Sequence, residues 1–142
     1  MNPAGILLDT GPLVALLSRN DKNHERARRM FAECAAPFRC CEAVLAEAAF
    51  LLGKVHGEGP AEVVALGARG VYSIGISAEG HWSAIETLLR KYSDRPISFA
   101  DACLIRCADV HQEARILTFD SDFSVYRWGR NRRFEILQPE RT

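Results

Sequence analysis

The sequence has no net charge, because 18 lysines and arginines are balanced by 18 aspartates and glutamates. A neutral chain has no strong overall attraction for polyanions, so nucleic acid would have to be bound through a local basic patch or through bound cations. There is no internal repeat, low-complexity tract or linker, and no apolar run is long enough to span a bilayer. These absences favour a soluble globular protein and exclude a membrane-spanning one.

The chain also lacks a recognisable export signal. Its start, MNPAGILLDTGPL, has no basic segment and reaches an aspartate at position 9. We therefore expect a cytoplasmic protein whose five cysteines are reduced thiols. Cys103 and Cys107, four residues apart on a predicted helix, would allow metal binding, but no C-x-x-C motif or nearby histidine completes a zinc set. The favoured interpretation is that the cysteines are small buried apolar side chains.

Strands and helices are predicted to alternate along the chain. Short apolar runs typical of buried strands occur at 5–9, 38–41, 71–75, 115–119 and 134–137. Helices are predicted from Pro12, over 23–35, around Glu47 as far as Gly57, and over 59–70, 78–92 and 99–112. This order predicts an α/β fold, a three-layer α/β/α sandwich around a mostly parallel sheet of four to five strands. Residues 1–142 suit a single domain that buries roughly 70 % of its unfolded surface, with Pro139 to Thr142 as a loose tail.

Acidic residues recur where the predicted strands end. Asp9 closes the first strand, and Asp120 and Asp122 follow the fourth in LTFDSDF. Asp101 lies in the first turn of the helix over 99–112, and Glu47 lies nearly two turns into the helix after the second strand. Ligands of open parallel sheets bind at the carboxyl ends of the strands and at the helix starts that follow them. Four separate segments therefore place acids at one end of the sheet.

Each of these aspartates also has a purely structural interpretation. Asp9 could cap the helix that begins near Pro12, and Ser98-x-x-Asp101 fits a capping box with Asp in place of the usual Glu. Asp120 and Asp122 could be ordinary turn residues after a strand.

Glu47 is harder to explain structurally, because no cap or turn role exists in the middle of a helix. Its neighbours one turn away are apolar, and a charged, dry and unpaired glutamate among apolar side chains costs several kcal/mol. The remaining structural explanations are that it extends into solvent or pairs with Arg39 or Lys54.

Taken together, the acids point to a bound cation. Two carboxylates about 5 Å apart repel each other by roughly 3 kcal/mol at an effective dielectric constant of about 20. A cluster of four or five would therefore stay ionised only if cations neutralise it. Oxygen ligands without cysteine or histidine suit Mg²⁺ or Mn²⁺, and these ions support phosphoryl-transfer chemistry by activating water.

Four segments, LLDTGPLVALL, VLAEAAFLL, SFADACLI and ILTFDSDF, resemble in their order and spacing a PIN domain, especially the VapC-like toxin ribonucleases. The resemblance runs from about Ile6 to Phe123. It implies a PIN-like fold and metal-dependent endonucleolytic cleavage of RNA. Cys41 stands where the family pattern has a serine or threonine, but this departure removes no acid.

The resemblance also implies roles for the acids. Asp9, Glu47, Asp101 and Asp120 are the expected catalytic residues and ligands of Mg²⁺ (or Mn²⁺), and Asp122 matches an additional acid of some members. As a hypothesis, Asp9 and Asp101 hold the principal ion with Asp120 alongside. Glu47 orients or deprotonates the attacking water, with or without a second ion shared with Asp122. Thr10, Ser98 and Thr118 could hydrogen-bond a carboxylate, water or phosphate, or serve only as caps and strand ends.

RNA binding is expected in the segment YRWGRNRRF, residues 126–134. Its arginines, with Arg127, Arg130 and Arg133 as the expected RNA-binding residues, would contact phosphates, and its aromatic rings would stack on unpaired bases. The alternative is a solvated basic hairpin that leads into the last strand. Family resemblance further implies a small antitoxin protein as partner and a homodimer, for which the apolar helix over 60–68 could supply the surface.

Several functional alternatives remain open from the sequence. A haloacid-dehalogenase-like phosphatase also begins with an aspartate after an apolar strand, but it requires a second aspartate two residues later, where this chain has Gly11. A PIN scaffold could bind RNA or protein without cutting. Within the nuclease interpretation, a toxin of a type II toxin–antitoxin pair is favoured over a stand-alone RNA-processing enzyme.

Overall fold

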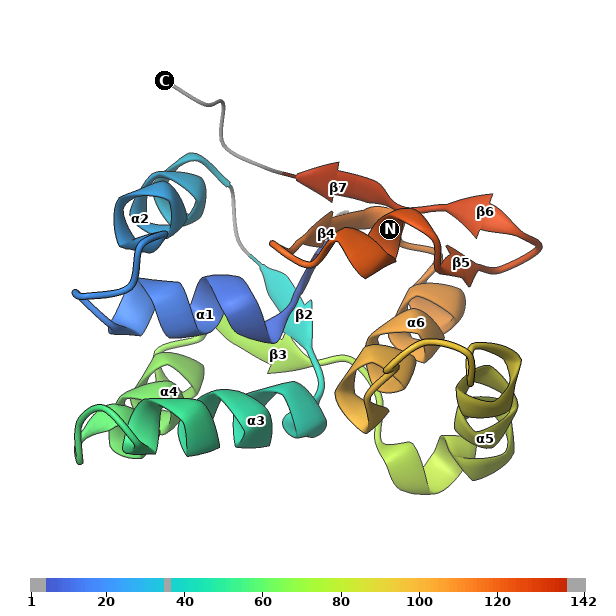
Figure 1. The fold of residues 1–142 in the computed structure, drawn as a ribbon, viewed down its shortest axis with the longest axis horizontal. Helices are drawn as coiled ribbons and strands as arrows, with labels where there is room; N and C mark the ends of the chain where they lie inside the picture. The colour runs from blue at the N-terminus through green and yellow to red at the C-terminus, as the bar shows by residue number, and fades with distance from the viewer. Residues whose placement is uncertain (1–4, 35–36, 138–142) are drawn as a thin grey trace.

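A parallel β-sheet forms the centre of the protein. The computed structural model describes residues 5–34 and 37–137 (Figure 1). Five strands form the main sheet: β1 (Ile6–Leu8), β2 (Phe38–Cys40), β3 (Tyr72–Ile74), β4 (Arg115–Leu117) and β7 (Glu135–Leu137). They lie in the order β3-β2-β1-β4-β7, and every neighbouring pair is parallel. The predicted mostly parallel sheet of four to five strands is confirmed.

Helices flank this sheet. They are α1 (Thr10–Leu17), α2 (His24–Glu33), α3 (Glu42–Gly53), α4 (Gly59–Ala68), α5 (Trp82–Lys91) and α6 (Phe99–His111), with short 3-10 turns η1 (Ala78–His81) and η2 (Ser121–Ser124). In Figure 1, α1 to α4 gather on the left of the view, and α5 and α6 lie together on the right. The arrangement confirms the predicted PIN-like α/β fold. The helix predicted over 78–92 is divided at His81 into η1 and α5.

The core lies where the central strands meet the helices. Leu7, Leu8, Ile116 and Leu117, on the adjacent strands β1 and β4, are completely buried. This burial on both faces explains why the strands appear in the sequence as continuous apolar runs. Four of the five cysteines are also buried and all five are free thiols, as the sequence predicts.

A small hairpin stands beside the main sheet. Its strands β5 (Arg127–Trp128) and β6 (Arg132–Arg133) are antiparallel, and both Gly129 and Asn131 in the turn have positive φ angles, of 55° and 61°. The basic hairpin that the sequence offered as an alternative for this segment is therefore present. It leads directly into β7.

A largely shielded ion pair closes the edge of the sheet where β1 and β2 begin. The Arg39 Nε donates to Oε1 of Glu113 at 2.8 Å, and the backbone N–H of Gly5 donates to the same oxygen at 2.8 Å. Glu113 is only 7 % exposed. A Cβ at Gly5 would come within van der Waals distance of both partners, so a larger residue here would displace the ion pair.

Some sequence predictions fall on residues that the structure does not describe. The predicted tail Pro139 to Thr142 and the end of the helix predicted over 23–35 lie outside the described residues. The assignment of 1–142 to one domain stays a prediction. None of the helices in the described ranges has the length and hydropathy needed to cross a membrane.

Candidate active site

Asp9 is fixed at the carboxyl edge of the sheet by the register between β1 and β4. Leu8 is aligned with Leu117, so the residues that follow, Asp9 and Thr118, lie next to each other. The Asp9 N–H donates to the Leu117 carbonyl at 3.1 Å, and the Thr118 hydroxyl donates to Oδ2 of Asp9 at 2.7 Å. Asp9 occupies the N-cap position of α1, but its side chain makes no capping hydrogen bond. The Asp9 carboxylate is therefore oriented by Thr118 and not by capping of α1.

Asp101 is positioned by the capping box that the sequence predicts. Its backbone N–H donates to the Ser98 hydroxyl at 3.0 Å, and its Oδ2 accepts from the Ser98 N–H at 3.1 Å. These two bonds begin α6 and fix the carboxylate in its first turn. Asp101 is 9 % exposed. The structural and functional interpretations of this residue are therefore compatible.

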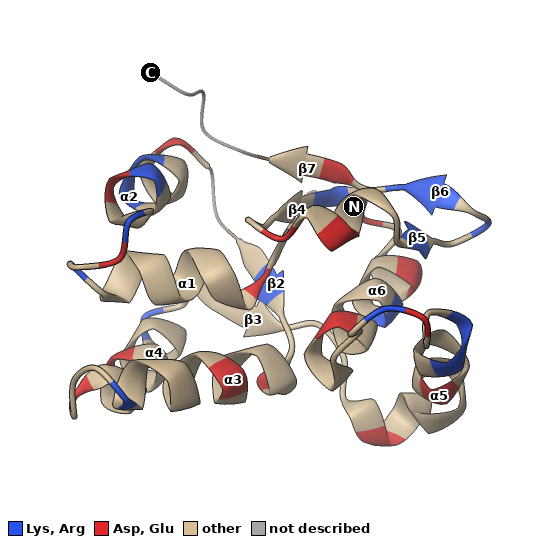
Figure 2. Ribbon diagram, viewed as in Figure 1, with Lys and Arg blue, Asp and Glu red and all other residues tan. Residues whose placement is uncertain are grey.

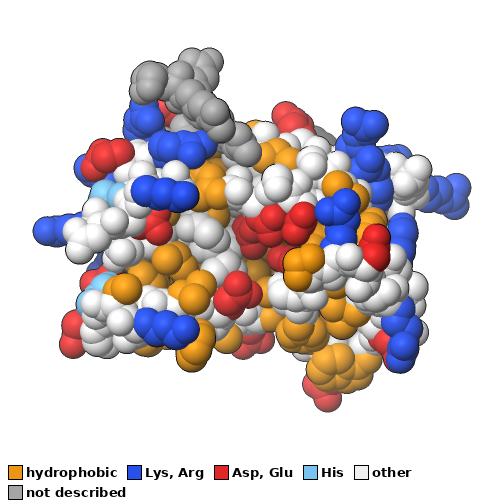
Figure 3. All heavy atoms as spheres, viewed as in Figure 1, with side chains coloured by type: hydrophobic (Ala, Val, Ile, Leu, Met, Phe, Trp, Pro, Cys, Tyr) orange, Lys and Arg blue, Asp and Glu red, His pale blue; other side chains and the backbone are white. Residues whose placement is uncertain are grey.

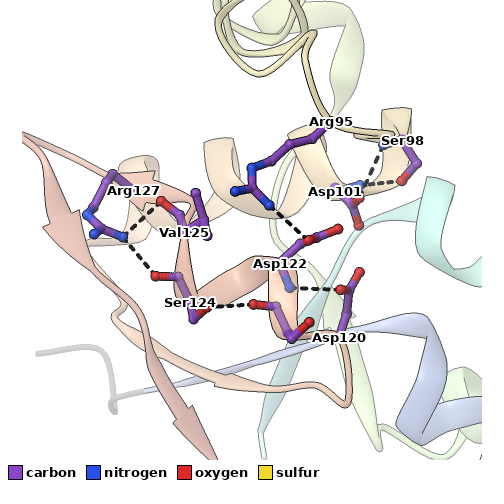
Figure 4. Close-up of polar contacts among 9 residues, drawn as sticks. Arg95, Ser98, Asp101, Asp120, Asp122, Ser124, Val125 and Arg127 are labelled. Atoms are coloured by element: carbon purple, nitrogen blue, oxygen red, sulfur yellow. Dashed lines mark hydrogen bonds and ion pairs between the residues drawn. The ribbon is translucent and has the colours of Figure 1, made fainter.

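Asp120 and Asp122 follow β4 in one tight turn. The Thr118 hydroxyl accepts from the Asp120 N–H at 2.9 Å, and Oδ1 of Asp120 accepts from the Asp122 N–H at 2.9 Å. Figure 4 shows the carboxylates of Asp101, Asp120 and Asp122 near one another. Asp101 comes from the start of α6, and the other two come from the turn after β4. Asp122 also forms an ion pair with Arg95 at 3.2 Å. Its predicted role as a metal ligand stays a prediction.

Glu47 projects from the second turn of α3 and is exposed, which corrects the expectation of a glutamate surrounded by buried apolar side chains. The helix instead buries Val44, Ala48 and Leu52, while Phe50 is 65 % exposed. The two suggested ion-pair partners have other contacts. Arg39 binds Glu113, and Lys54 lies 4.4 Å from the centre of the Phe50 ring.

One pocket of about 450 Å³ brings four of the five acids together. Its lining residues are Asp9, Thr10, Gly11, Val14, Asp21, Asn23, Glu47, Leu51, Pro96, Ser98, Asp101, Phe119 and Asp120. Asp122 is not among the lining residues. In the space-filling view, acidic side chains gather near the middle of this face, with basic side chains on both sides (Figure 3). The predicted convergence of acids from four segments is present in the structure.

The electrostatics of Asp9 reflect its burial beside other acids. Burial is the main cause that raises its pKa, to about 7, and the hydrogen bond from Thr118 partly opposes it. Asp101 and Asp120 raise the pKa further through repulsion. In the absence of a cation, Asp9 is therefore half protonated near neutral pH.

Repulsion connects the other acids as well. Burial raises the pKa of Glu47, and the charges of Asp101 and Asp120 add to this effect. The pKa of Asp101 is raised mainly by burial, opposed by its bonds to Ser98 and raised again by Asp120 and Asp122. These mutual effects fall off with distance, so they indicate that the carboxylates share one electrostatic environment.

The chemistry of the pocket fits a hard divalent cation. Its polar lining consists of carboxylate, hydroxyl and amide groups, with no cysteine or histidine. The hydroxyl of Thr10 is buried and has no hydrogen-bond partner among the described residues, so a donor or acceptor beside Asp9 stays unused. As the side chains are placed, no three His, Cys, Asp or Glu residues within 5–34 and 37–137 are close enough to enclose an ion. Side chains would have to reorient around a bound ion, and those of Glu47 and Asp120 are exposed.

The three arginines predicted to bind RNA all lie in or next to the β5–β6 hairpin. Arg127 donates through Nη1 to the carbonyls of Ser124, Val125 and Tyr126, which end η2. Arg130 and Arg133 are exposed. Their RNA-binding role stays a prediction, and the hairpin contacts show that Arg127 also has a structural role.

The aromatic residues of this segment do not have the role expected from the sequence. Tyr126 is completely buried, and Trp128 is 5 % exposed with its Nε1–H donating to the Arg133 carbonyl at 3.1 Å. Neither ring can stack on an unpaired base. They pack the hairpin against α6 and η2, where Tyr126 meets Phe123 at a ring-centre distance of 5.1 Å.

Sequence reasoning missed three residues near the acids. Arg95 lies in the loop that was interpreted only as a chain break, and it holds Asp122. Asn23 and Phe119 line the pocket. Phe119 could have been found from its position directly before Asp120. Its contact with Arg26 of α2 joins distant segments, so the sequence gives no sign of it.

Comparisons with known proteins agree with this geometry. A model of the PIN domain family matches residues 6–129, which include all five acids. A comparison with curated protein sequences found no match. The structure is similar to the crystal structure of VapC20 from Mycobacterium tuberculosis, a toxin that cleaves the sarcin–ricin loop. The TM-score is 0.76 with 27 % sequence identity, over 85 % of this chain and 94 % of VapC20.

PIN domains are generally metal-dependent nucleases that typically use Mg²⁺. The family model covers most of the chain, and the similarity to a VapC toxin also extends over most of it. The chain therefore belongs to the PIN domain family.

Proposed function

We propose that this protein is a Mg²⁺-dependent endoribonuclease and the toxin of a type II toxin–antitoxin pair. The observation that carries the proposal is the pocket in which carboxylates from four separate segments of a PIN domain converge. Without a cation a charged Asp9 is unfavourable in this pocket, because burial raises its pKa and the neighbouring Asp101 and Asp120 raise it further. Similarity to a ribonuclease toxin supports RNA as the substrate.

The residues of the pocket divide between holding a cation and handling water. Asp9 and Asp101 would hold Mg²⁺ with Asp120 beside them, and Thr118 orients Asp9. When bound, Mg²⁺ supplies positive charge that stabilises the developing charge on the phosphate. Glu47, exposed at the pocket and with a raised pKa, accepts a proton from the attacking water. The water oxygen bonds to phosphorus as the bond to the 3′ oxygen breaks, and the leaving 3′ oxygen takes a proton from solvent, which gives a 5′-phosphate and a 3′-hydroxyl.

A cleavage assay tests the nuclease activity. Purified protein is incubated with an RNA that contains the sarcin–ricin loop and with an unstructured RNA, in Mg²⁺ and in EDTA. We expect cleavage only with Mg²⁺, products with 5′-phosphate ends, and no cleavage by Asp101→Asn, which keeps an oxygen to cap α6. Undiminished Mg²⁺-dependent cleavage by purified Asp101→Asn protein would refute the assignment. Stable Mg²⁺ binding without cleavage would instead favour a scaffold.

Expression in a bacterium tests the toxin role. We expect growth arrest when the chain is produced alone and normal growth with Asp101→Asn at the same protein level. A stand-alone RNA-processing enzyme would leave growth unaffected in both cases. The cytoplasmic location expected from the sequence is part of this proposal.

Exposed apolar side chains support protein partners, either an antitoxin or a second copy. Phe50 and Val55 are each 65 % exposed, and Val64 on the neighbouring α4 is 72 % exposed. Residues 60–68, the predicted dimer surface, include Val64 but also the buried Val63. Light scattering of the purified protein, alone and as Val64→Glu, tests the dimer. A mass of one chain in both samples would contradict it.

A further inference from the structure

Arg26 is anchored at the wall of the acidic pocket. Its guanidinium carbon lies 5.0 Å from the centre of the Phe119 ring, and its Nη1 donates to Oδ1 of Asn23 at 3.1 Å. Phe119 and Asn23 both line the pocket. The Arg26 Nε is shielded from solvent and has no hydrogen-bond partner in the described part of the chain. The bond to Asn23 uses one of the five N–H groups of the guanidinium, so the two Nη groups keep donor capacity for a ligand.

The charge of Arg26 is held without a carboxylate. Within residues 5–34 and 37–137, Arg26 forms no ion pair, whereas Arg28 on the same helix pairs with Glu25 at 3.4 Å. A stack on an aromatic ring and a bond to an amide oxygen fix the orientation of a guanidinium but leave its charge uncompensated. A guanidinium held in one orientation in this way is suited to bind a phosphate group.

An RNA strand that enters this pocket needs cations nearby, because its phosphates are repelled by the acids. On the hairpin side, Arg95 is paired with Asp122 and Arg127 is bonded to three backbone carbonyls. On the opposite side, basic residues lie on α2, with the acid-bearing segments in between (Figure 2). Arg26 is one of these basic residues of α2, and it contacts Phe119 and Asn23 of the pocket lining.

We propose that Arg26 binds a phosphate of the RNA strand next to the bond that is cleaved, with Phe119 and Asn23 as its positioning residues. The inference rests on the proposed ribonuclease function and adds the direction of the bound strand, from the acids toward α2. Because a phosphate contact does not read the base, the interaction strengthens binding to all RNA sequences about equally.

The salt dependence of RNA binding tests this role. In an Asp101→Asn background, the affinity for a fluorescein-labelled single-stranded RNA is measured at several salt concentrations. We expect Arg26→Gln to reduce the slope of log K against log salt by about 0.7, the value for one phosphate of a single strand. Arg26→Met, which keeps the hydrocarbon stem over Phe119, should give the same reduction. In the active protein, Arg26→Gln should raise KM several-fold with little change in kcat.

Arg28→Gln is the matched control, since Arg28 is an exposed arginine on the same helix with a carboxylate partner. It should leave the slope unchanged. Phe119→Leu keeps the charge of Arg26 but removes its support, so it should weaken binding without a change of slope. Unchanged slopes for both Arg26 variants, in a protein whose parent cleaves RNA, would overturn this inference alone. A parent that neither binds nor cleaves RNA would overturn the proposed function together with it.

Discussion

The substitution Asp9→Asn should make the metal-free protein more stable at neutral pH while it abolishes cleavage. Asp9 has a pKa of about 7 in the folded protein against 3.8 for an ordinary aspartate. The folded state therefore binds the proton more tightly than the unfolded state between these two values. The free energy of unfolding falls as pH rises through this window, by at most roughly 4 kcal/mol for a shift of about three pKa units. Asparagine removes this loss and can still accept from Thr118.

Urea denaturation in EDTA measures this effect. The parent protein and Asp9→Asn should have similar free energies of unfolding at about pH 4, and the variant should be the more stable protein at about pH 8. Because the other acids are common to both proteins, only the difference between the two curves is interpreted. Mg²⁺ at about a hundred times its dissociation constant should stabilise the parent by about 2.7 kcal/mol and the variant far less. A variant no more stable than the parent near about pH 8 would refute the reasoning.

Two further substitutions test separate parts of the structure. Thr118→Val removes the hydrogen bond that lowers the pKa of Asp9, so the rising limb of the cleavage rate against pH should move to higher pH. An unmoved limb would mean that Asp9 does not control it. Glu113→Gln should destabilise the protein by roughly 3 kcal/mol, because the largely buried Arg39 would lose its negatively charged partner. Thermal and urea unfolding measure this loss, kcat should not change, and the exposed pair offers Glu25→Gln as a control within about 0.5 kcal/mol.

Much of the fold was predictable because local signals agree with the tertiary structure. The strand residues 6–8 and 116–117 are buried on both faces, so they appear in the sequence as short apolar runs. The capping box of Ser98 and Asp101 is likewise encoded within four residues. Parallel strands then bring Asp9 and Asp120 to one edge, which follows from topology alone.

The parts that could not be predicted depend on contacts between distant segments. The side of α3 that faces the core is decided by its neighbours, so Phe50 is exposed beside Glu47 although most residues of the helix are apolar. Trp128 is buried because the hairpin folds onto α6. The pairing of Arg95 with Asp122 joins two loops 27 residues apart, and sequence spacing gives no indication of it.

The reciprocal bonds between Ser98 and Asp101 have a practical consequence for mutagenesis of this protein. An alanine scan at position 101 would delete the start of a helix together with a carboxylate, and a loss of activity could then reflect misfolding. Asparagine at position 101 separates the loss of charge from the loss of the helix start. Its amide oxygen can still accept from the Ser98 N–H, while the negative charge is removed. In this protein, the informative inactive variant is the one that leaves the helix start intact.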